Sequence, residues 1–360
     1  METNERVQKL VDVARGKHNI LVCTHNNPDP DALACAAGVR LLLGKLLKVK
    51  PKVVYGGVVG RAENRAMINI LRLNVRPFDK RMLGKKTTVI LVDTQPGASN
   101  NPLPRGFVPA AVLDHHKPIR RMTGLCDFSD IRPDYGSAST IVMEYIRAAG
   151  IEPNARIATA LLYGIQTDTL GIGRSGLKQD VQAMQYLFSL ASLPLLHKIQ
   201  NPKLPREYLY VFADAIERSR VIKDVLTCRL DDIASPDAIA EMSDFLLKAE
   251  GIGWVLVTGM HNGDLLFSLR TSGKSRTAGD LVRRIAGTKG AAGGHVRSAG
   301  GKIHLKEGSS KEDIMGSYHA LSAKLEQRLY SSLKRTGEPR RFRPHPEPDR
   351  GNCSAVSDSN

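Results

Sequence analysis

The sequence predicts an α/β protein in which a larger domain with a largely parallel sheet precedes a smaller α/β domain, with a cleft between them. Short apolar runs of strand length alternate with longer segments of helical periodicity, which is typical of parallel sheets covered by helices. A chain of 360 residues is long enough for two domains with separate cores. Hydrophobic residues make up 42% and charged residues 24% of the chain, as in folded globular proteins.

The first domain is expected over residues 1–192 and begins with a helix. Thr3 is its N-cap, and apolar residues recur behind Thr3 at helical spacing. Buried strands are then predicted at 19–23, 52–55, 88–92 and 110–113. Further helices are predicted at 31–47, 137–149, 154–167 and 178–190, and a helix or loop at 61–73. This alternation supports the parallel sheet.

A connecting segment is expected over 193–222, because three prolines interrupt it before a helix at 206–219. The second domain is expected over 223–335. Its strands are predicted at 225–230, 253–259 and 265–271, with a hairpin turn at 261–264. Its helices are predicted at 236–249, 277–286 and 311–334. A glycine-rich loop is predicted at 290–301, and a strand between that loop and the last helix. Residues 336–360 lack apolar periodicity and are predicted to form a disordered basic tail.

Composition narrows the classes of function. The five cysteines form no CxxC pair, which argues against a disulfide framework and against a thiolate zinc site. No apolar run approaches the length of a signal peptide or a membrane span, so we expect a cytoplasmic protein without a membrane partner. The formal net charge of +16 favours an anionic partner such as a nucleotide or nucleic acid.

Acids and histidines follow several of the predicted apolar segments. His25, Asp29 and Asp31 follow the first strand, Asp93 follows another, and Asp114-His115-His116 ends the apolar run that precedes it. Asp168 follows an apolar helix. Because ligands of open α/β sheets bind beyond the carboxyl ends of the strands, the groups that follow strands should meet at one edge. So many carboxylates would repel one another without cations, and two divalent metals would satisfy them.

These segments resemble the DHH phosphoesterase superfamily, in the branch with a carboxy-terminal DHH-associated domain. The resemblance spans residues 20–301 and is strongest to the oligoribonuclease (nanoRNase) and adenosine bisphosphate phosphatase group. Cyclic-dinucleotide phosphodiesterases and RecJ-type exonucleases are more distantly similar. The matching segments are His25-Asn26-Asn27-Pro28-Asp29-Pro30-Asp31, Val92-Asp93, Leu113-Asp114-His115-His116, Gln166-Thr167-Asp168-Thr169, Gly293-Gly294-His295 and Ala299-Gly300.

The resemblance implies a site with two Mn²⁺ ions, for which Mg²⁺ or Co²⁺ are expected substitutes. It assigns His25 and Asp29 to one metal, and Asp31, His115 and Asp168 to the other, with Asp93 bridging both. It places His116 against the scissile phosphate and lets Asp114 orient the neighbouring imidazoles. His116, Asp114 and Asp93 are therefore the expected catalytic residues.

The second domain is expected to bind the substrate. Gly293 and Gly294 would let the backbone approach a phosphate, and His295 would donate to that phosphate. Arg270 on the preceding strand would make a bidentate contact with it. Lys274, Arg276 and Lys289 add positive charge, and each is interpreted as an ordinary surface residue.

Three functions are compatible with these residues. The first is a manganese-dependent phosphodiesterase or phosphatase that acts on short oligonucleotides or on a nucleoside 3',5'-bisphosphate. The second is a cyclic or linear dinucleotide phosphodiesterase with the same chemistry. The third is a non-catalytic nucleotide- or RNA-binding protein that uses the basic second domain and tail. Inorganic pyrophosphate or polyphosphate is a further candidate substrate, and the sequence leaves a homodimer open.

Overall fold

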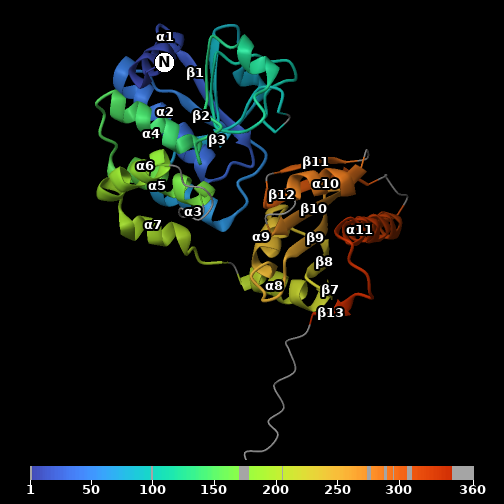
Figure 1. Ribbon diagram of the computed structural model, residues 1–360. Coiled ribbons are helices and arrows are strands. Elements are labelled where there is room, and N and C mark those ends of the chain that lie inside the picture. The colour runs from blue at the N-terminus through green and yellow to red at the C-terminus, as the bar shows by residue number, and fades with distance from the viewer. Residues whose placement is uncertain are drawn as a thin grey trace, which may run out of the picture. The chain divides into compact units, whose positions relative to one another are not determined.

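The computed structural model describes residues 2–98, 100–169, 178–204, 206–273, 277–287, 290–294, 296–305 and 310–342. The chain divides into two compact units, Met1–Lys203 and Leu204–Asn360, and each is described by itself. Figure 1 shows a sheet with helices in each unit. The α/β class that the sequence predicts is confirmed.

The first unit contains a six-stranded sheet in which every pair of neighbouring strands is parallel. Its strand order is β3-β2-β1-β4-β5-β6. The strands are β1 (Asn19–Asn26), β2 (Lys52–Gly56), β3 (Val75–Pro77), β4 (Thr87–Val92), β5 (Ala111–Asp114) and β6 (Phe128–Ile131). The short strands β3 and β6 were not predicted, and both lie at the edges of the sheet. The adjacent strands β1, β4 and β5 end side by side, which positions the residues that follow them.

Seven α-helices accompany this sheet in the described residues. They are α1 (Thr3–Ala14), α2 (Pro30–Leu47), α3 (Ala62–Leu71), α4 (Ala138–Ala148), α5 (Ala155–Thr169), α6 (Lys178–Leu190) and α7 (Leu193–Gln200). Short 3-10 helices occur at η1 (Lys80–Met82) and η2 (Arg121–Leu125). Helix α2 is apolar around most of its circumference because it packs against α4 and α5 as well as the sheet.

The second unit contains a seven-stranded sheet of order β11-β12-β10-β9-β8-β7-β13. Only β8 and β9 pair in parallel among its described strands. The strands are β7 (Arg220–Ile222), β8 (Val225–Asp232), β9 (Trp254–His261), β10 (Asp264–Thr271), β11 (Ala291–Gly294), β12 (Ser298–His304) and β13 (Arg340–Arg341). The helices are α8 (Arg206–Arg218), α9 (Asp237–Leu246), α10 (Ala278–Ala286) and α11 (Lys311–Leu333).

Three predictions differ from the structure. The expected connecting segment 193–222 is divided: α7 buries Leu196 and Ile199 in the core of the first unit, whereas α8 and β7 pack in the second. The expected glycine-rich loop at 290–301 contains β11 and part of β12, which pair with each other. The start of the predicted disordered tail is wrong, because β13 pairs with β7 and Phe342 packs beside it. Residues 343–360 lie outside the described residues.

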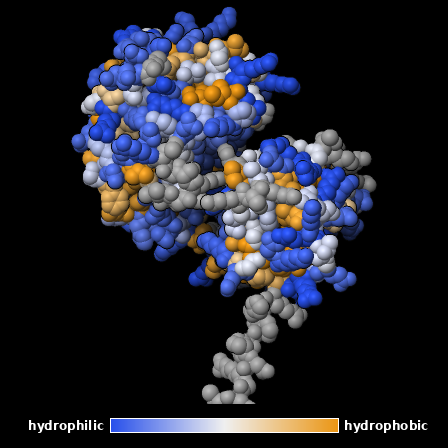
Figure 2. All heavy atoms as spheres, in the orientation of Figure 1, coloured by the Kyte–Doolittle hydropathy of each residue, from blue (hydrophilic) through white to orange (hydrophobic). Residues whose placement is uncertain are grey.

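The surface of both units is mostly polar in the view of Figure 2, where blue marks hydrophilic residues. Within the described ranges, no helix combines the length and the hydrophobicity that crossing a membrane requires. Each unit buries an apolar core of its own.

Candidate metal centre

The centre lies where three neighbouring parallel strands of the first unit end. His25 is near the end of β1, Asp93 directly follows β4, and Asp114 is the last residue of β5. His115 and His116 continue the chain from β5. Because these strands run in the same direction, the side chains converge at the carboxyl edge of the sheet.

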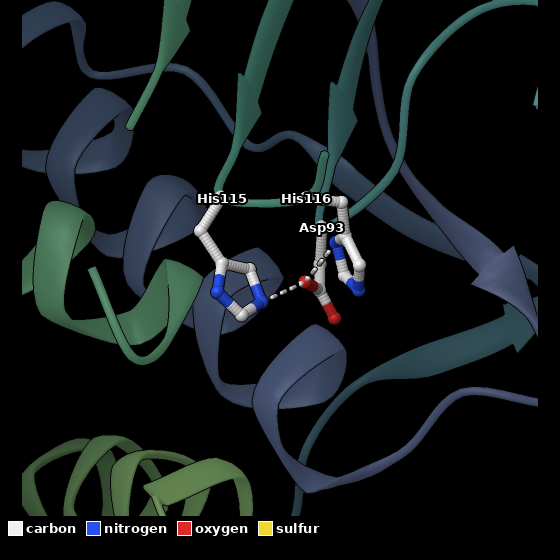
Figure 3. A group of neighbouring side chains, drawn as sticks. All are labelled: Asp93, His115 and His116. Carbon is white, nitrogen blue, oxygen red and sulfur yellow. Dashed lines mark ion pairs between the residues drawn. The ribbon is translucent and has the colours of Figure 1, made fainter. Parts of the chain in front are cut away.

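Asp93 lies in the middle of this group. Its backbone has φ 56°, in the left-handed region that aspartate tolerates better than most residues, and its N–H donates to the Leu113 carbonyl at 2.9 Å. Figure 3 shows the Asp93 carboxylate between the rings of His115 and His116. Asp93 Oδ1 is 3.4 Å from His115 Nε2 and 3.6 Å from His116 Nδ1. The turn after β4 therefore aims a buried carboxylate at two imidazoles.

Three groups of three residues meet the geometric requirements for holding a cation. In the first, His25 Nε2 lies 3.5 Å from Asp93 Oδ2 and 3.7 Å from Asp29 Oδ1. In the second, His115 Nε2 lies 3.4 Å from Asp168 Oδ2 and 3.9 Å from Asp31 Oδ2. The structure thus brings together all six residues to which the resemblance assigns metals, and it groups Asp93 with His25 and Asp29. A third group consists of Asp93, His115 and His116.

Two helix starts hold two of the aspartates of this centre, Asp29 and Asp31. Asp29 is the N-cap of α2 and accepts a hydrogen bond from the Ala32 N–H at 3.0 Å. Asp31 is fully buried and accepts from the Ala138 and Ser139 N–H groups, at 2.7 and 2.9 Å, at the start of α4. The partial positive charge of a helix N-terminus stabilises a carboxylate in such a place. These contacts fix both carboxylates without using all of their lone pairs.

The donor set fits divalent cations. The Nδ1 atoms of His25 and His115 lie 2.9 and 3.1 Å from the backbone carbonyls of Asn26 and Tyr135, which leaves each Nε2 facing the carboxylates. Asp93 Oδ1 and His115 Nε2 are buried and have no hydrogen-bond partner in the described part of the chain. Buried polar atoms are almost always paired, so these two point to a ligand. Carboxylates and imidazoles together suit Mn²⁺ and similar metals.

Electrostatics support the same conclusion. Burial raises the pKa of the Asp31 carboxyl well above its usual range, and the charges of Asp93 and Asp168 raise that pKa further. Burial opposes the charge on Asp93, but close contact with the His115 and His25 imidazoles and attraction to their charge lower its pKa overall. Burial likewise disfavours charged His115, but Asp168 and Asp93 raise its pKa well above its usual value. The cluster therefore needs bound positive charge, supplied by protons or by metal ions.

Gln95 is a member of the site that the sequence did not predict. Its Nε2 donates to Asp114 Oδ2 at 2.8 Å and to the His116 carbonyl at 2.9 Å. Its Oε1 accepts from the Arg120 N–H at 2.7 Å and from Thr123 Oγ1 at 3.2 Å. Asp114 Oδ1 in turn lies 2.8 Å from His116 Nδ1. Gln95 therefore fixes the carboxylate that orients His116.

The predicted substrate residues of the second unit lie on β10 and β11. Arg270 on β10 is 9% exposed, and its guanidinium donates to Asp244 Oδ1, Ser268 Oγ and the carbonyls of Leu269 and Ala299. Gly293 and Gly294 lie on β11 and are exposed. The remaining predicted residues lie outside the described residues: His295, Lys274, Arg276 and Lys289. The structure thus gives Arg270 internal partners and leaves the glycine backbone open.

Two family models match this chain. The model described as DHH family, N-terminal domain, matches residues 19–165, and the DHHA1 domain model matches residues 223–316. Together these matches cover more than half of the chain. The first contains all of the strands that carry the metal centre, and the second contains the β11–β12 pair.

The chain is also similar to named proteins. It is 33% identical over 321 residues to an uncharacterized protein of Methanocaldococcus jannaschii. That alignment covers 87% of this chain and 65% of that protein. It is 30% identical over 151 residues to a probable manganese-dependent inorganic pyrophosphatase of Streptococcus pyogenes, over 42% of this chain and 48% of that protein. The chain therefore spans less than two thirds of the length of either relative.

One solved structure resembles most of the chain. It is the crystal structure of an exopolyphosphatase-related protein from Bacteroides fragilis, with a TM-score of 0.68 and 15% sequence identity. The likeness covers 92% of this chain and 97% of that one. At this identity it shows a shared fold.

Proposed function

Because the chain belongs to the DHH phosphoesterase superfamily, we propose that it is a metal-dependent hydrolase of short oligonucleotides, of a nucleoside 3',5'-bisphosphate, or of both. The observation that supports hydrolysis is the centre described above. It gathers four buried or half-buried carboxylates and two imidazoles, with Asp93 Oδ1 and His115 Nε2 unpaired in the described residues. A protein that only binds nucleotides does not need such a strained collection of charges.

The residues of the centre have distinct tasks in this proposal. His25, Asp29 and Asp93 would hold one cation, and Asp31, His115 and Asp168 would hold the other, with Asp93 Oδ1 3.4 Å from His115 Nε2. Bound Mn²⁺ ions act as Lewis acids toward a phosphoryl group. His116 contributes through its Nε2, because Asp114 engages its Nδ1. Asp114 and Gln95 keep that ring in one orientation.

The second unit supports a nucleotide substrate. Gly293 has open space where a Cβ would lie, so its backbone can approach a phosphate without steric hindrance. The net charge of +16 attracts polyanions to the protein. We place short oligonucleotides and nucleoside bisphosphates first on these grounds, and cyclic or linear dinucleotides second.

A phosphoanhydride is a further candidate substrate. The similarity to a protein named as a manganese-dependent inorganic pyrophosphatase favours pyrophosphate, and the fold shared with an exopolyphosphatase-related protein is compatible with polyphosphate. The pyrophosphatase match covers 42% of this chain, so it says little about the second unit. The choice between ester and anhydride therefore depends on a direct assay.

The test is a substrate panel with the metal-stripped protein to which Mn²⁺ or Mg²⁺ is added. The panel contains adenosine 3',5'-bisphosphate, RNA of two to five nucleotides, cyclic di-adenylate, pyrophosphate and polyphosphate, and products are separated by chromatography. We expect Mn²⁺-dependent release of mononucleotide or phosphate from the first two substrates. An Asp93→Ala variant purified in the same way reports any contaminating hydrolase.

Turnover of only pyrophosphate or polyphosphate would replace phosphate esters by phosphoanhydrides as the substrate class. Binding of two metal ions without turnover of any substrate in the panel would contradict both classes. If neither metal binding nor turnover occurred, the hydrolase proposal itself would be wrong.

A further inference from the structure

A cavity lies in the first unit, away from the metal centre. Its volume is about 560 Å³, within the range of cavities that hold small organic ligands. It is lined by the second half of α2, the start of β2, residues 71–75 and the start of α5. Helices α2 and α5 also carry Asp31 and Asp168 at their other ends. At 1.5 Å per residue, Lys45 is about 21 Å from Asp31 along α2, so the two sites are separate.

The cavity combines an apolar floor with a cationic rim. Val53, Leu71 and Leu73 are buried in its wall. Five cationic residues line it: Arg40, Lys45, Lys50, Arg72 and Arg156. Among the described residues, no aspartate or glutamate lines it.

In the part of the chain that the structure describes, these five cationic side chains lack the carboxylate partners that usually accompany a cluster of positive charge. Arg40 donates to the Asn74 carbonyl at 3.3 Å, but none of the five forms an ion pair with a carboxylate within the described ranges. Lys45 and Arg72 lie at the ends of α2 and α3, where a cation is favourable. Arg156 lies in the first turn of α5, where the helix dipole disfavours a cation. An anion in the cavity would offset that cost.

We propose that this cavity is a binding site for a nucleoside di- or triphosphate, distinct from the metal centre. The five positive charges match a polyphosphate chain better than the single charge of a carboxylate, and the apolar floor suits a base and sugar. The N-terminus of α5 adds a favourable field, although Asn154 Oδ1 already accepts from the Arg156 and Ile157 N–H groups. The phosphates would therefore be held by side chains.

Binding is measured by calorimetry with ATP, ADP, adenosine and tripolyphosphate, on the full chain with EDTA present. Without metal ions, the metal centre cannot bind nucleotide through a bridging cation. We expect ATP and ADP to bind at submillimolar concentration, and adenosine and tripolyphosphate at least tenfold more weakly. Equal affinity for ATP and tripolyphosphate would show that the apolar floor plays no part, and would overturn the assignment to a nucleotide.

Matched charge variants separate the cavity from general attraction to a basic protein. Arg40→Glu combined with Arg156→Glu should weaken ATP binding at least tenfold. Lys9→Glu combined with Lys17→Glu makes the same change in net charge at exposed positions of the first unit and should leave binding unchanged. An equal loss in both pairs, or no ATP binding at millimolar concentration, would overturn the proposal. Arg40→Gln with Arg156→Gln replaces the first pair if circular dichroism shows misfolding.

Discussion

Two sets of buried charges differ in how the protein itself satisfies them. In the first unit, Asp93 Oδ1 and His115 Nε2 are buried without a hydrogen-bond partner in the described residues. In the second unit, the buried Arg270 guanidinium donates to a carboxylate, a hydroxyl and two carbonyls. Unsatisfied buried groups indicate a ligand, whereas satisfied groups indicate scaffolding. We therefore expect substitutions in the first set to act on metal binding and activity, and substitutions of Arg270 to act on stability.

The largest effect is expected for Asp93→Asn, which removes a carboxylate that belongs to the His25 group and also faces His115 of the other group. Hydrolysis should fall to the background level. Excess Mn²⁺, at a hundredfold its Kd, should stabilise the wild type by about 2.7 kcal/mol and raise Tm by roughly 5–10 °C. The variant should gain much less. Asp127→Asn, at an exposed position of the same unit, is the control. Equal stabilisation of Asp93→Asn and wild type would show that the metals bind elsewhere.

The adjacent glycines of β11 provide a paired test in the second unit. A Cβ at Gly294 would overlap Ala299 Cα and the Ser298 carbonyl of β12, whereas a Cβ at Gly293 would meet no atom within 4 Å. Gly294→Ala should destabilise the second unit by about 2–3 kcal/mol in urea unfolding. Gly293→Ala should leave stability unchanged and raise KM, because a methyl group would stand between backbone and phosphate. Unchanged KM for Gly293→Ala would exclude close approach of the substrate there.

Arg270→Met tests whether this arginine is scaffolding or a phosphate ligand. The substitution removes the guanidinium that donates to Asp244 and to the Ala299 carbonyl, so we expect a loss of about 2–3 kcal/mol in urea unfolding. Arg284→Met, at an exposed position on α10, should change stability by less than about 0.5 kcal/mol. A raised KM with full stability would instead support the bidentate phosphate contact that the sequence predicts.

The metal centre could be predicted because topology determines it. Each predicted ligand on a strand end follows an apolar run, and parallel neighbours bring those ends together. The pairing of Asp31 with the start of α4 could not be predicted, because it joins positions more than a hundred residues apart. The predicted roles of the individual ligands stay predictions until metal binding is measured.

The glycine-rich hairpin and the final strand show where local patterns fail. Glycine has a low strand propensity, so residues 290–301 are predicted to form a loop, but residues 291–294 and 298–301 form strands because β11 pairs with β12 and β12 pairs with β10. Arg340 and Arg341 carry no apolar pattern, and their strand forms because β7 offers an unpaired edge. In both cases long-range pairing outweighs the local sequence.

Among the substitutions of Asp93, Gly294, Arg270 and Gln95, we expect Gln95→Leu to have the smallest effect. The variant loses the donor that fixes Asp114, so the His116 ring should become less ordered and kcat should fall about 10- to 100-fold. KM and Mn²⁺ affinity should change little, because Gln95 belongs to none of the three cation-holding groups. Gln182→Leu, at an exposed position, controls for the loss of an amide.

A second measurement on Gln95→Leu distinguishes loss of the His116 orientation from a general loss of folding. In ¹⁵N NMR of the metal-free protein, the His116 Nδ1–H that faces Asp114 should be protected from exchange in the wild type and exposed in Gln95→Leu. Gln95→Glu keeps the size but turns an acceptor toward Asp114, so it should lower kcat more than leucine does. If Gln95→Glu retained full kcat, the amide donor would have no part in orienting His116. Buried Gln95 would then belong with Arg270 among the satisfied groups that support the fold.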